Sequence, residues 1–380
     1  MWRFLAIPGL IICCSISLHS QSNYLDRPDL MALSDSCLHH TYNFSFVKAR
    51  QFQQTLRNKT PDHPAPPFLG ALILYWEHFP LIPDDPETNQ FIELMDRSVA
   101  LAQRMMEDKE RELEGLFFDL FGRAFKAMFW ADNGKSGKVI PDLRTMYKHT
   151  KAGFALKEQF SEFYFSTGLY NYYIEAYPRA HPVYKPLLSF MQEGDMELGL
   201  KQLNHAIHHS IYLRVEAMLF MSLIQLNYEN DLNTAAIYAE KLYREYPGNI
   251  YYQGHLVAIL LHLHSYDRVR EVLLETGLAG SPPRRAREVN LQSDNYSEMI
   301  RQFSAAFLAE RESGDETTAE KRYIRTIELA GSFGPFTDNY RAMGYMGLSR
   351  LYAKKNLQSE SKRYARKAEN HTAYRFILDE

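Results

Sequence analysis

Three histidines, His205, His208 and His209, form the group of side chains whose types and spacing most suggest chemistry. Residues at i, i+3 and i+4 of a helix share one face, so these imidazoles could together hold a divalent metal. The sequence contains no H-E-x-x-H motif, and no cysteine lies near the cluster. Solvated histidines on a helix surface explain the pattern more simply, and we predict no metal and no cofactor.

Other catalytic motifs are also missing from the sequence. The segment Asn133–Lys138 lacks the G-x-x-x-x-G-K-[ST] spacing of a phosphate loop and follows a predicted helix instead of a strand. No G-x-S-x-G element offers a serine nucleophile. The acidic run Glu107–Glu114 has the i, i+4 charge pairs of a solvated helix face. We therefore predict a protein that binds a partner and is not an enzyme.

Pairs of helices are the elements that would position functional groups, and Glu216–Asn249 shows the pattern best. Asn230-Asp231 supplies the chemistry of a tight turn in the middle of this 34-residue segment. Pro247 ends the second helix because proline has no N–H to donate, and the small Ala235 lets the two helices approach closely. The apolar stripe of the first helix consists of Leu219, Leu223 and Leu226.

The next segment, Ile250–Pro283, continues the same frame without a gap. Ser265–Asp267 forms its turn, and Val269 and Leu273 occupy the positions of the two alanines of the preceding unit. No stretch of the sequence shows a convincing alternation typical of strands. Further frames begin at Leu30, Pro64, Ile300 and Ala342, and one begins near Ala180.

This register resembles the tetratricopeptide repeat, a 34-residue helical hairpin with the loose pattern W-x2-L-G-x2-Y, then A-x3-F, then P. Leu223 and Leu242 are larger than the pattern prefers, so the central unit is divergent. A shorter stretch, Gly168–Pro178 followed by Phe190 and Gly194–Leu200, is similar to the eukaryotic inclusion-body-clearance repeat family and its bacterial relatives. That family brings no established active site.

The resemblance implies an all-α fold, namely a right-handed superhelical α-solenoid of tetratricopeptide-like helical hairpins. Each hairpin cannot bury its apolar face alone, so neighbours stack into one core. The predicted segments are a signal peptide (1–20), N-terminal repeat-like helices (21–79), a divergent helical region (80–179), central repeat units (180–283), a linker (284–299) and C-terminal repeat-like units (300–380).

Composition and charge restrict the class of partner. Apolar residues make up 46% of the 380 residues, which is ample for a continuous core. The net charge is −3, and Lys and Arg are spread along the chain instead of clustered. A nucleic-acid partner would need a basic patch, so we predict none.

The first twenty residues have the layout of a secretory signal peptide. Arg3 is the positive residue, Phe4–Leu18 is the apolar region, and Ser20 precedes a cleavage site. A lipoprotein anchor at Cys13 is a weaker alternative because Ile12 stands where a small residue is required. Cleavage leaves Cys37 as the last cysteine, so we predict a buried structural thiol and no disulfide. We expect a secreted, bacterial periplasmic protein with no membrane span after cleavage.

The resemblance further implies that the first helices of the hairpins line a concave groove that binds a protein or peptide. Aromatic side chains with a polar tip suit such a surface. That they merely pack against adjacent helices is an equal alternative. The Lys and Asn clamp with which some repeat proteins grip a terminal carboxylate is missing. The groove candidates are Tyr184, Met191, Gln192, Phe220, Ile224, Asn227, Tyr228, Tyr251 and His262.

We therefore predict a scaffold or adaptor that holds a protein or peptide partner in this groove. The alternative is an accessory protein or enzyme with a small-molecule or glycan pocket in the aromatic helical region Phe117–Tyr177.

Overall fold

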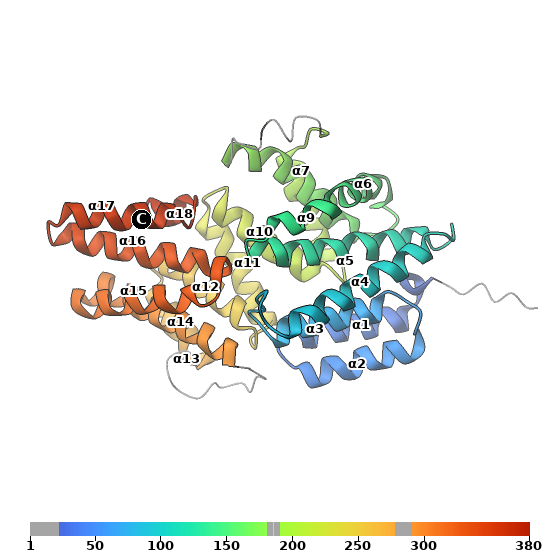
Figure 1. The fold of residues 1–380 in the computed structure, drawn as a ribbon, viewed down its shortest axis with the longest axis horizontal. Coiled ribbons are helices and arrows are strands. Elements are labelled where there is room, and N and C mark those ends of the chain that lie inside the picture. Colours follow the sequence, from blue (N-terminus) through green and yellow to red (C-terminus); the bar gives the residue numbers. More distant parts are fainter. Residues whose placement is uncertain (1–22, 181–184, 186–190, 278–290) are drawn as a thin grey trace, which may run out of the picture.

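The structure is a computed structural model, and it describes residues 23–180, 185, 191–277 and 291–380. Within these ranges the regular elements are all helices, and helices that follow one another pack side by side (Figure 1). This confirms the predicted all-α class, and the pairwise packing is that of an α-solenoid. The predicted signal peptide and Tyr184 lie outside the described residues.

The helices follow one another with short connections along most of the chain. The first half contains α1 (Pro28–Tyr42), α2 (Phe46–Lys59), α3 (Ala65–Glu77), α4 (Glu87–Met105), α5 (Glu112–Asp132), α6 (Ile140–Leu156) and α7 (Phe163–Ala180). The second half contains α9 (Met196–His209), α10 (Arg214–Asn227), α11 (Leu232–Glu245), α12 (Ile250–His262), α13 (Tyr266–Thr276), α14 (Leu291–Leu308), α15 (Glu316–Gly331), α16 (Asp338–Lys354), α17 (Gln358–Glu369) and α18 (Arg375–Leu378). A π-helical turn, η4 (Ala309–Ser313), extends α14, and a 3-10 turn, η5 (Gly334–Thr337), precedes α16.

The two hairpins predicted for residues 216–283 are present as α10 with α11 and α12 with α13, with residues 278–283 outside the described ranges. Ala235 and Ala239 are fully buried between their helices, as the small side chains indicated. Asp231 begins α11 by accepting a hydrogen bond from the Thr234 N–H at 3.0 Å, which satisfies one of the free donors at the helix start. The turn chemistry in the sequence therefore sets the boundary of the second helix.

Five hairpin turns share one backbone conformation, which is direct structural evidence of a repeat. One residue of each turn is left-handed, and the N–H of the next residue bonds back to the end of the first helix; Ser265 N–H, for example, donates to Leu260 O at 2.9 Å. Bonds of this kind satisfy carbonyl groups that the helix end leaves free. The left-handed residues are Phe44, Asn230, His264, Gly314 and Asn356, with φ between 55° and 68°.

A second recurring feature joins the two helices of a hairpin. A small polar side chain in the first helix donates to a carbonyl oxygen in the second, and the buried thiol predicted at Cys37 is one case. Burial raises the pKa of this thiol to about 12, so it stays an uncharged donor. The three bonds are Cys37 Sγ to Ala49 O (3.4 Å), Ser222 Oγ to Ala235 O (2.8 Å) and Ser349 Oγ to Ser361 O (2.9 Å).

The first hairpins contact helices far along the chain as well as their neighbours. In an open solenoid each repeat touches only its neighbours, but here the first hairpin lies against the central helices. Tyr42 donates to Glu216 of α10, and Asn249 Nδ2 donates to Tyr42 O at 3.0 Å. Trp76 of α3 packs against Tyr252 of α12, with ring centroids 5.8 Å apart. These contacts leave an aromatic interior where an open groove was expected.

Residues 284–299, expected to form a linker, are partly helical. Residues 284–290 are outside the described ranges, whereas 291–299 form the first half of α14. Tyr296 packs against Phe79 with ring centroids 5.1 Å apart, and Ser293 Oγ donates to Phe79 O at 2.8 Å. This helix start depends on a distant partner, which local sequence does not reveal. The helices of the described ranges include none that is both long and apolar enough to cross a membrane.

Candidate functional site

An aromatic cavity of about 230 Å³ lies at the centre of the helical array. Its walls come from α3, α5, α7, α10 and α12, with contributions from η5 and the segment before α18. Figure 1 shows α10 to α12 between the N-terminal helices and the C-terminal hairpins. The lining residues are Tyr75, Trp76, Phe79, Phe125, Met128, Asp132, Tyr173, Glu216, Leu219, Phe220, Leu223, Asn227, Tyr228, Tyr251, Tyr252, Phe336 and Tyr374.

One face of α10 forms a continuous strip of the cavity wall. Its members follow the i, i+3, i+4, i+7, i+11 spacing of a helix face. They are Glu216, Leu219, Phe220, Leu223 and Asn227. The opposite face, with Val215, Met218 and Ser222, is buried in the core. Helix α10 is therefore apolar on two sides, and the second side is the one that the cavity uses.

Aromatic rings meet the α10 strip from several directions. Phe79, just after α3, lies 5.6 Å from the Tyr251 ring of α12 and 5.5 Å from the Phe336 ring of η5, measured between centroids. On the other side, Tyr228 lies 5.4 Å from Tyr173 and 6.3 Å from Tyr374. Edge-to-face contacts of this kind hold rings in fixed orientations, so the cavity has a defined shape without a ligand.

Glu216 brings a carboxyl group to the cavity. Its Oε1 accepts from the Tyr42 hydroxyl, while its buried Oε2 has no hydrogen-bond partner among the described residues. Burial raises the pKa of Glu216 to about 7. An unpaired buried carboxylate is costly, so this group is divided between its neutral and charged forms near neutral pH.

Asp132, the last residue of α5, brings the second carboxyl group. Asp132 is exposed to the cavity, and the protein packed around its carboxyl group raises its pKa to about 7. The negative end of the α5 dipole lies at the same place and adds to the cost of a charge there. In the described part of the chain Asp132 has no hydrogen bond or ion pair, and no Lys, Arg or His is among the described lining residues.

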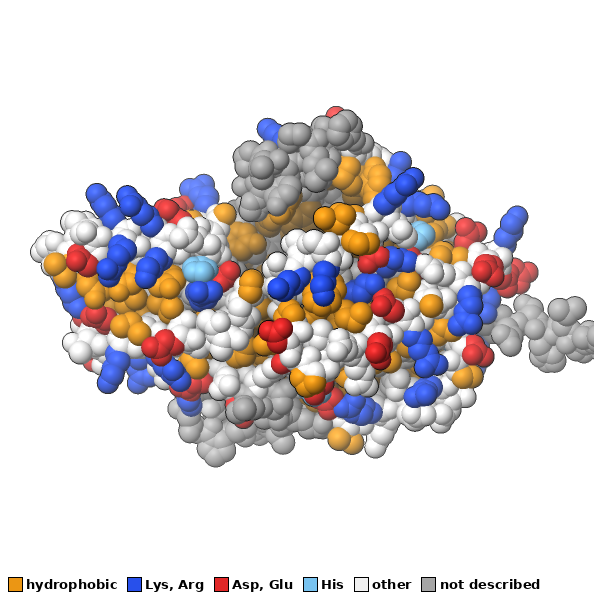
Figure 2. All heavy atoms as spheres, viewed as in Figure 1, with side chains coloured by type: hydrophobic (Ala, Val, Ile, Leu, Met, Phe, Trp, Pro, Cys, Tyr) orange, Lys and Arg blue, Asp and Glu red, His pale blue; other side chains and the backbone are white. Residues whose placement is uncertain are grey.

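The cavity opens into an adjoining hollow of about 440 Å³. The two spaces share six lining residues, so they lie next to one another. In the hollow, Asp338 is already paired with Arg341 at 3.1 Å and with His371 at 2.9 Å. Figure 2 shows apolar side chains gathered between the C-terminal hairpins and the part of the molecule around α5 and α7. The shared residues are Asp132, Leu223, Asn227, Tyr251, Phe336 and Tyr374.

The structure brings together four of the predicted groove residues and separates the others. Phe220, Asn227, Tyr228 and Tyr251 line the cavity, while Ile224 is fully buried in the core. Met191 and Gln192 precede α9 and do not line the cavity.

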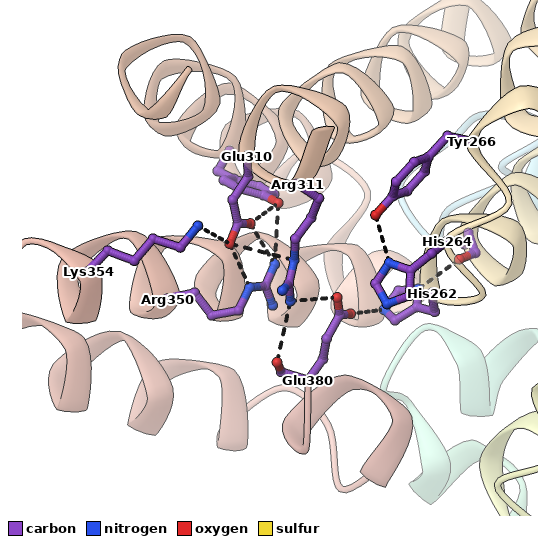
Figure 3. A network of polar contacts seen from close by, with 10 residues as sticks. His262, His264, Tyr266, Glu310, Arg311, Arg350, Lys354 and Glu380 are labelled. Carbon is purple, nitrogen blue, oxygen red and sulfur yellow. Dashed lines mark hydrogen bonds and ion pairs between the residues drawn. The ribbon is translucent and has the colours of Figure 1, made fainter. Parts of the chain in front are cut away.

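His262 belongs to a polar network near the end of the chain (Figure 3). Its Nε2 pairs with Glu380 at 2.9 Å, and Arg311 pairs with the same carboxylate at 2.9 Å. Nearby, the buried Glu310 accepts two hydrogen bonds from Arg350, at 2.9 and 2.8 Å. His262 therefore ties α12 to the C-terminal segment through Glu380, and it is not among the residues that line the cavity.

The aromatic region proposed as the alternative site contributes to the same cavity. Phe125, Met128 and Asp132 come from α5, and Tyr173 comes from α7. The two sites expected from the sequence are therefore two walls of one space. The histidine cluster lies elsewhere: the His205 ring stacks between Tyr164 at 3.9 Å and His209 at 4.0 Å. Across the described ranges, no group of three or more His, Cys, Asp or Glu is arranged to hold a metal ion.

Sequence reasoning missed the residues that give the cavity its chemistry. Trp76 lies in α3 and Phe79 lies just after it, whereas Phe336 and Tyr374 lie in the C-terminal third of the chain. One signal was available: Glu216 shares a face of α10 with Leu219, Phe220 and Leu223, and charged side chains are rarely buried on an apolar face.

The chain matches no protein-family model and no curated protein. The cavity is therefore the feature that bears on function.

Proposed function

We propose that this protein is a binding protein, a scaffold or adaptor that holds a segment of a protein or peptide partner at the aromatic cavity. The observation that carries the proposal is the cavity: a preformed aromatic space at the centre of a helical array, open to the surface. Rigid aromatic pockets of this kind anchor the side chains that dominate binding energy. We further propose that the array is a right-handed tetratricopeptide-type superhelix, exported to the periplasm and acting without catalysis.

The size of the cavity favours one inserted side chain over a large ligand. Pockets for drug-sized molecules range from roughly 300 to 1,000 Å³, and this cavity holds about 230 Å³. The adjoining hollow of about 440 Å³ gives room for the backbone of the segment that carries the side chain. The rival function is the binding of a small molecule or glycan, which the α5 and α7 contribution to the wall supports.

Selection from a random peptide library displayed on phage tests the proposal. Selected peptides should bind the wild-type protein, and Leu223→Trp, which fills the cavity, should weaken them by about tenfold or more, equivalent to roughly 1.4 kcal/mol. Ile237→Ala is the matched control because this exposed apolar side chain of α11 does not line the cavity. The melting temperature of each variant shows that it folds.

Two results would contradict the proposal. If peptides bind Leu223→Trp as well as the wild type, the cavity is not the binding site. If no peptide is selected but a sugar or other small molecule raises the melting temperature of the wild type and not of Leu223→Trp, the rival function is correct.

A further inference from the structure

The chemistry of the cavity wall identifies the kind of side chain it accepts. Eleven of the seventeen lining residues are aromatic, and three more are aliphatic or sulfur-containing. The face of an aromatic ring carries partial negative charge and attracts cations, most strongly where water is excluded. The remaining lining residues are Asp132, Glu216 and Asn227, so every ionisable carboxyl in the wall adds to the negative potential of the rings.

Neither carboxyl group has a cationic partner at hydrogen-bond distance in the described residues, unlike two buried acids elsewhere in the molecule. Glu310 is bound by Arg350, and the buried Asp119 pairs with Arg123 at 2.9 Å and His149 at 3.0 Å. Glu216, by contrast, has a buried Oε2 with no partner among the described residues. A cation in the cavity would supply a counter-charge to the exposed Asp132 and, through its electrostatic field, would favour the charged form of the enclosed Glu216.

The field of Asp132 also reaches the tyrosines around it. Burial and the charge of Asp132 together raise the pKa of Tyr75 and of Tyr251 above the ordinary value near 10. The pKa of Tyr374 is also raised, mainly by burial and also by the charge of Asp132. The three tyrosines come from separate parts of the chain, and all of them line the cavity together with Asp132.

We propose that the cavity selects a cationic side chain, Lys or Arg, of a bound peptide segment, with the aromatic rings around the cation and Asp132 and Glu216 as counter-charges. This inference rests on the proposed peptide-binding function and names the residue that the peptide must carry. Neutral side chains of similar length fill the same volume but leave both carboxylates unpaired, so they bind more weakly.

Calorimetric titration with paired peptides tests the inference on the full chain. A peptide selected from the library, or an alanine-based peptide with one central Lys, is compared with the same peptide carrying norleucine in place of Lys. The Lys peptide should bind about tenfold or more tightly. Asp132→Asn and Glu216→Gln should each remove most of this preference, whereas Glu197→Gln, an exposed acid of α9 paired with Lys201, should leave it unchanged. Melting temperatures confirm that all variants are folded.

The possible outcomes distinguish the preference for a cation from the peptide-binding function on which it rests. The cation inference is overturned if the Lys peptide and the norleucine peptide bind in the cavity with equal affinity. It is also overturned if the Lys peptide binds Asp132→Asn and Glu216→Gln as tightly as the wild type. Either result leaves the peptide-binding function standing. Absence of any peptide binding overturns the proposed function. A free organic cation is the other ligand that could fit the cavity, and choline compared with its neutral isostere 3,3-dimethylbutan-1-ol tests it. If choline binds and the Lys peptide does not, the cavity binds a free organic cation and the peptide assignment is overturned.

Discussion

Glu216 places a carboxyl group between the fold interior and the aromatic cavity. Its pKa is raised by burial from an ordinary value near 4.5 to about 7. The folded state therefore holds this proton more tightly than the unfolded chain does. The resulting contribution to stability is fully present below about pH 4.5 and is lost as pH rises through 7.

The first prediction concerns the pH dependence of unfolding. Between pH 5 and pH 8 the wild type should lose roughly 1–3 kcal/mol more unfolding free energy than Glu216→Gln, which keeps the acceptor for Tyr42 and never ionises. Urea denaturation at several pH values measures the difference, with Glu197→Gln as the control. Parallel curves for wild type and Glu216→Gln would show that the carboxyl does not titrate in this window.

The groups that face Glu216 are Tyr42, Tyr246, Tyr252, Arg214 and Glu162. Burial also raises the pKa of Glu162 to about 7, and the comparison with Glu216→Gln removes this background because Glu162 is unchanged in the variant.

The second prediction concerns binding and belongs to Asp132. Burial raises its pKa to about 7, so below pH 7 protons compete with a cationic ligand for the carboxylate. The affinity for choline, whose charge does not titrate, should fall about tenfold per pH unit between pH 7 and pH 5 and level off above pH 7. Calorimetric titration measures this slope, which Asp132→Asn should reduce without abolishing, because Glu216 lines the same cavity and also has a pKa of about 7; an unchanged slope in that variant would assign the competing proton to Glu216 or another group. The other titratable groups of the site are Glu216, Tyr75, Tyr251 and Tyr374, with His371 and Asp338 in the adjoining hollow.

At the scale of the element, the left-handed turn residue sets the geometry of each hairpin. Asn230 has φ of 55° and is exposed, so its backbone conformation matters more than its packing. Asn tolerates this region, whereas Ala carries a penalty of roughly 1 kcal/mol there. Asn230→Ala should lower the unfolding free energy by about that amount, measured by urea denaturation. Asn233→Ala is the control, since Asn233 is equally exposed but helical; an equal effect of both variants would refute the role of the turn.

The same turns explain how much of the fold could be read from the sequence. Asn230-Asp231 and Ala235 are local signals, because a turn and a close helix contact depend on residues only a few positions apart. They predicted the α10–α11 hairpin correctly. Leu219 and Leu223 were assigned to helix packing, but α10 has two apolar faces and these side chains line the cavity. Local spacing identifies an apolar face without telling which partner covers it.

The cavity itself depends on contacts between distant parts of the chain. The ring of Trp76 meets Tyr252, and Phe79 meets Phe336, across separations that no 34-residue period specifies. The sequence therefore predicted Phe220, Tyr228 and Tyr251 as members of a functional surface, but it could not predict Asp132 as their neighbour. Contacts of α1 and α3 with α10 and α12 turn the expected groove into an aromatic cavity.

At the scale of the whole molecule, the position of the first hairpin depends on its contact with the turn before α12. Gly248 N–H donates to Asn43 Oδ1 at 3.0 Å, and Asn249 Nδ2 donates to Tyr42 O at 3.0 Å. A Cβ at position 248 would lie 2.4 Å from Asn43 O, which is too close for any real side chain. Glycine is therefore required here by the approach of two backbones.

Gly248→Ala should separate these two parts of the array and weaken the site at a distance. We expect a loss of about 1–3 kcal/mol in unfolding free energy, the usual cost of overpacking. Affinity for the Lys peptide should also fall, because α3 and α12 carry facing walls of the cavity although neither Gly248 nor Asn43 lines it. Gly137→Ala is the matched control, since a Cβ there meets no atom within 4 Å. Denaturation and calorimetric titration of both variants measure the two effects. Normal stability and affinity in Gly248→Ala would mean that the cavity does not need this contact with the first hairpin.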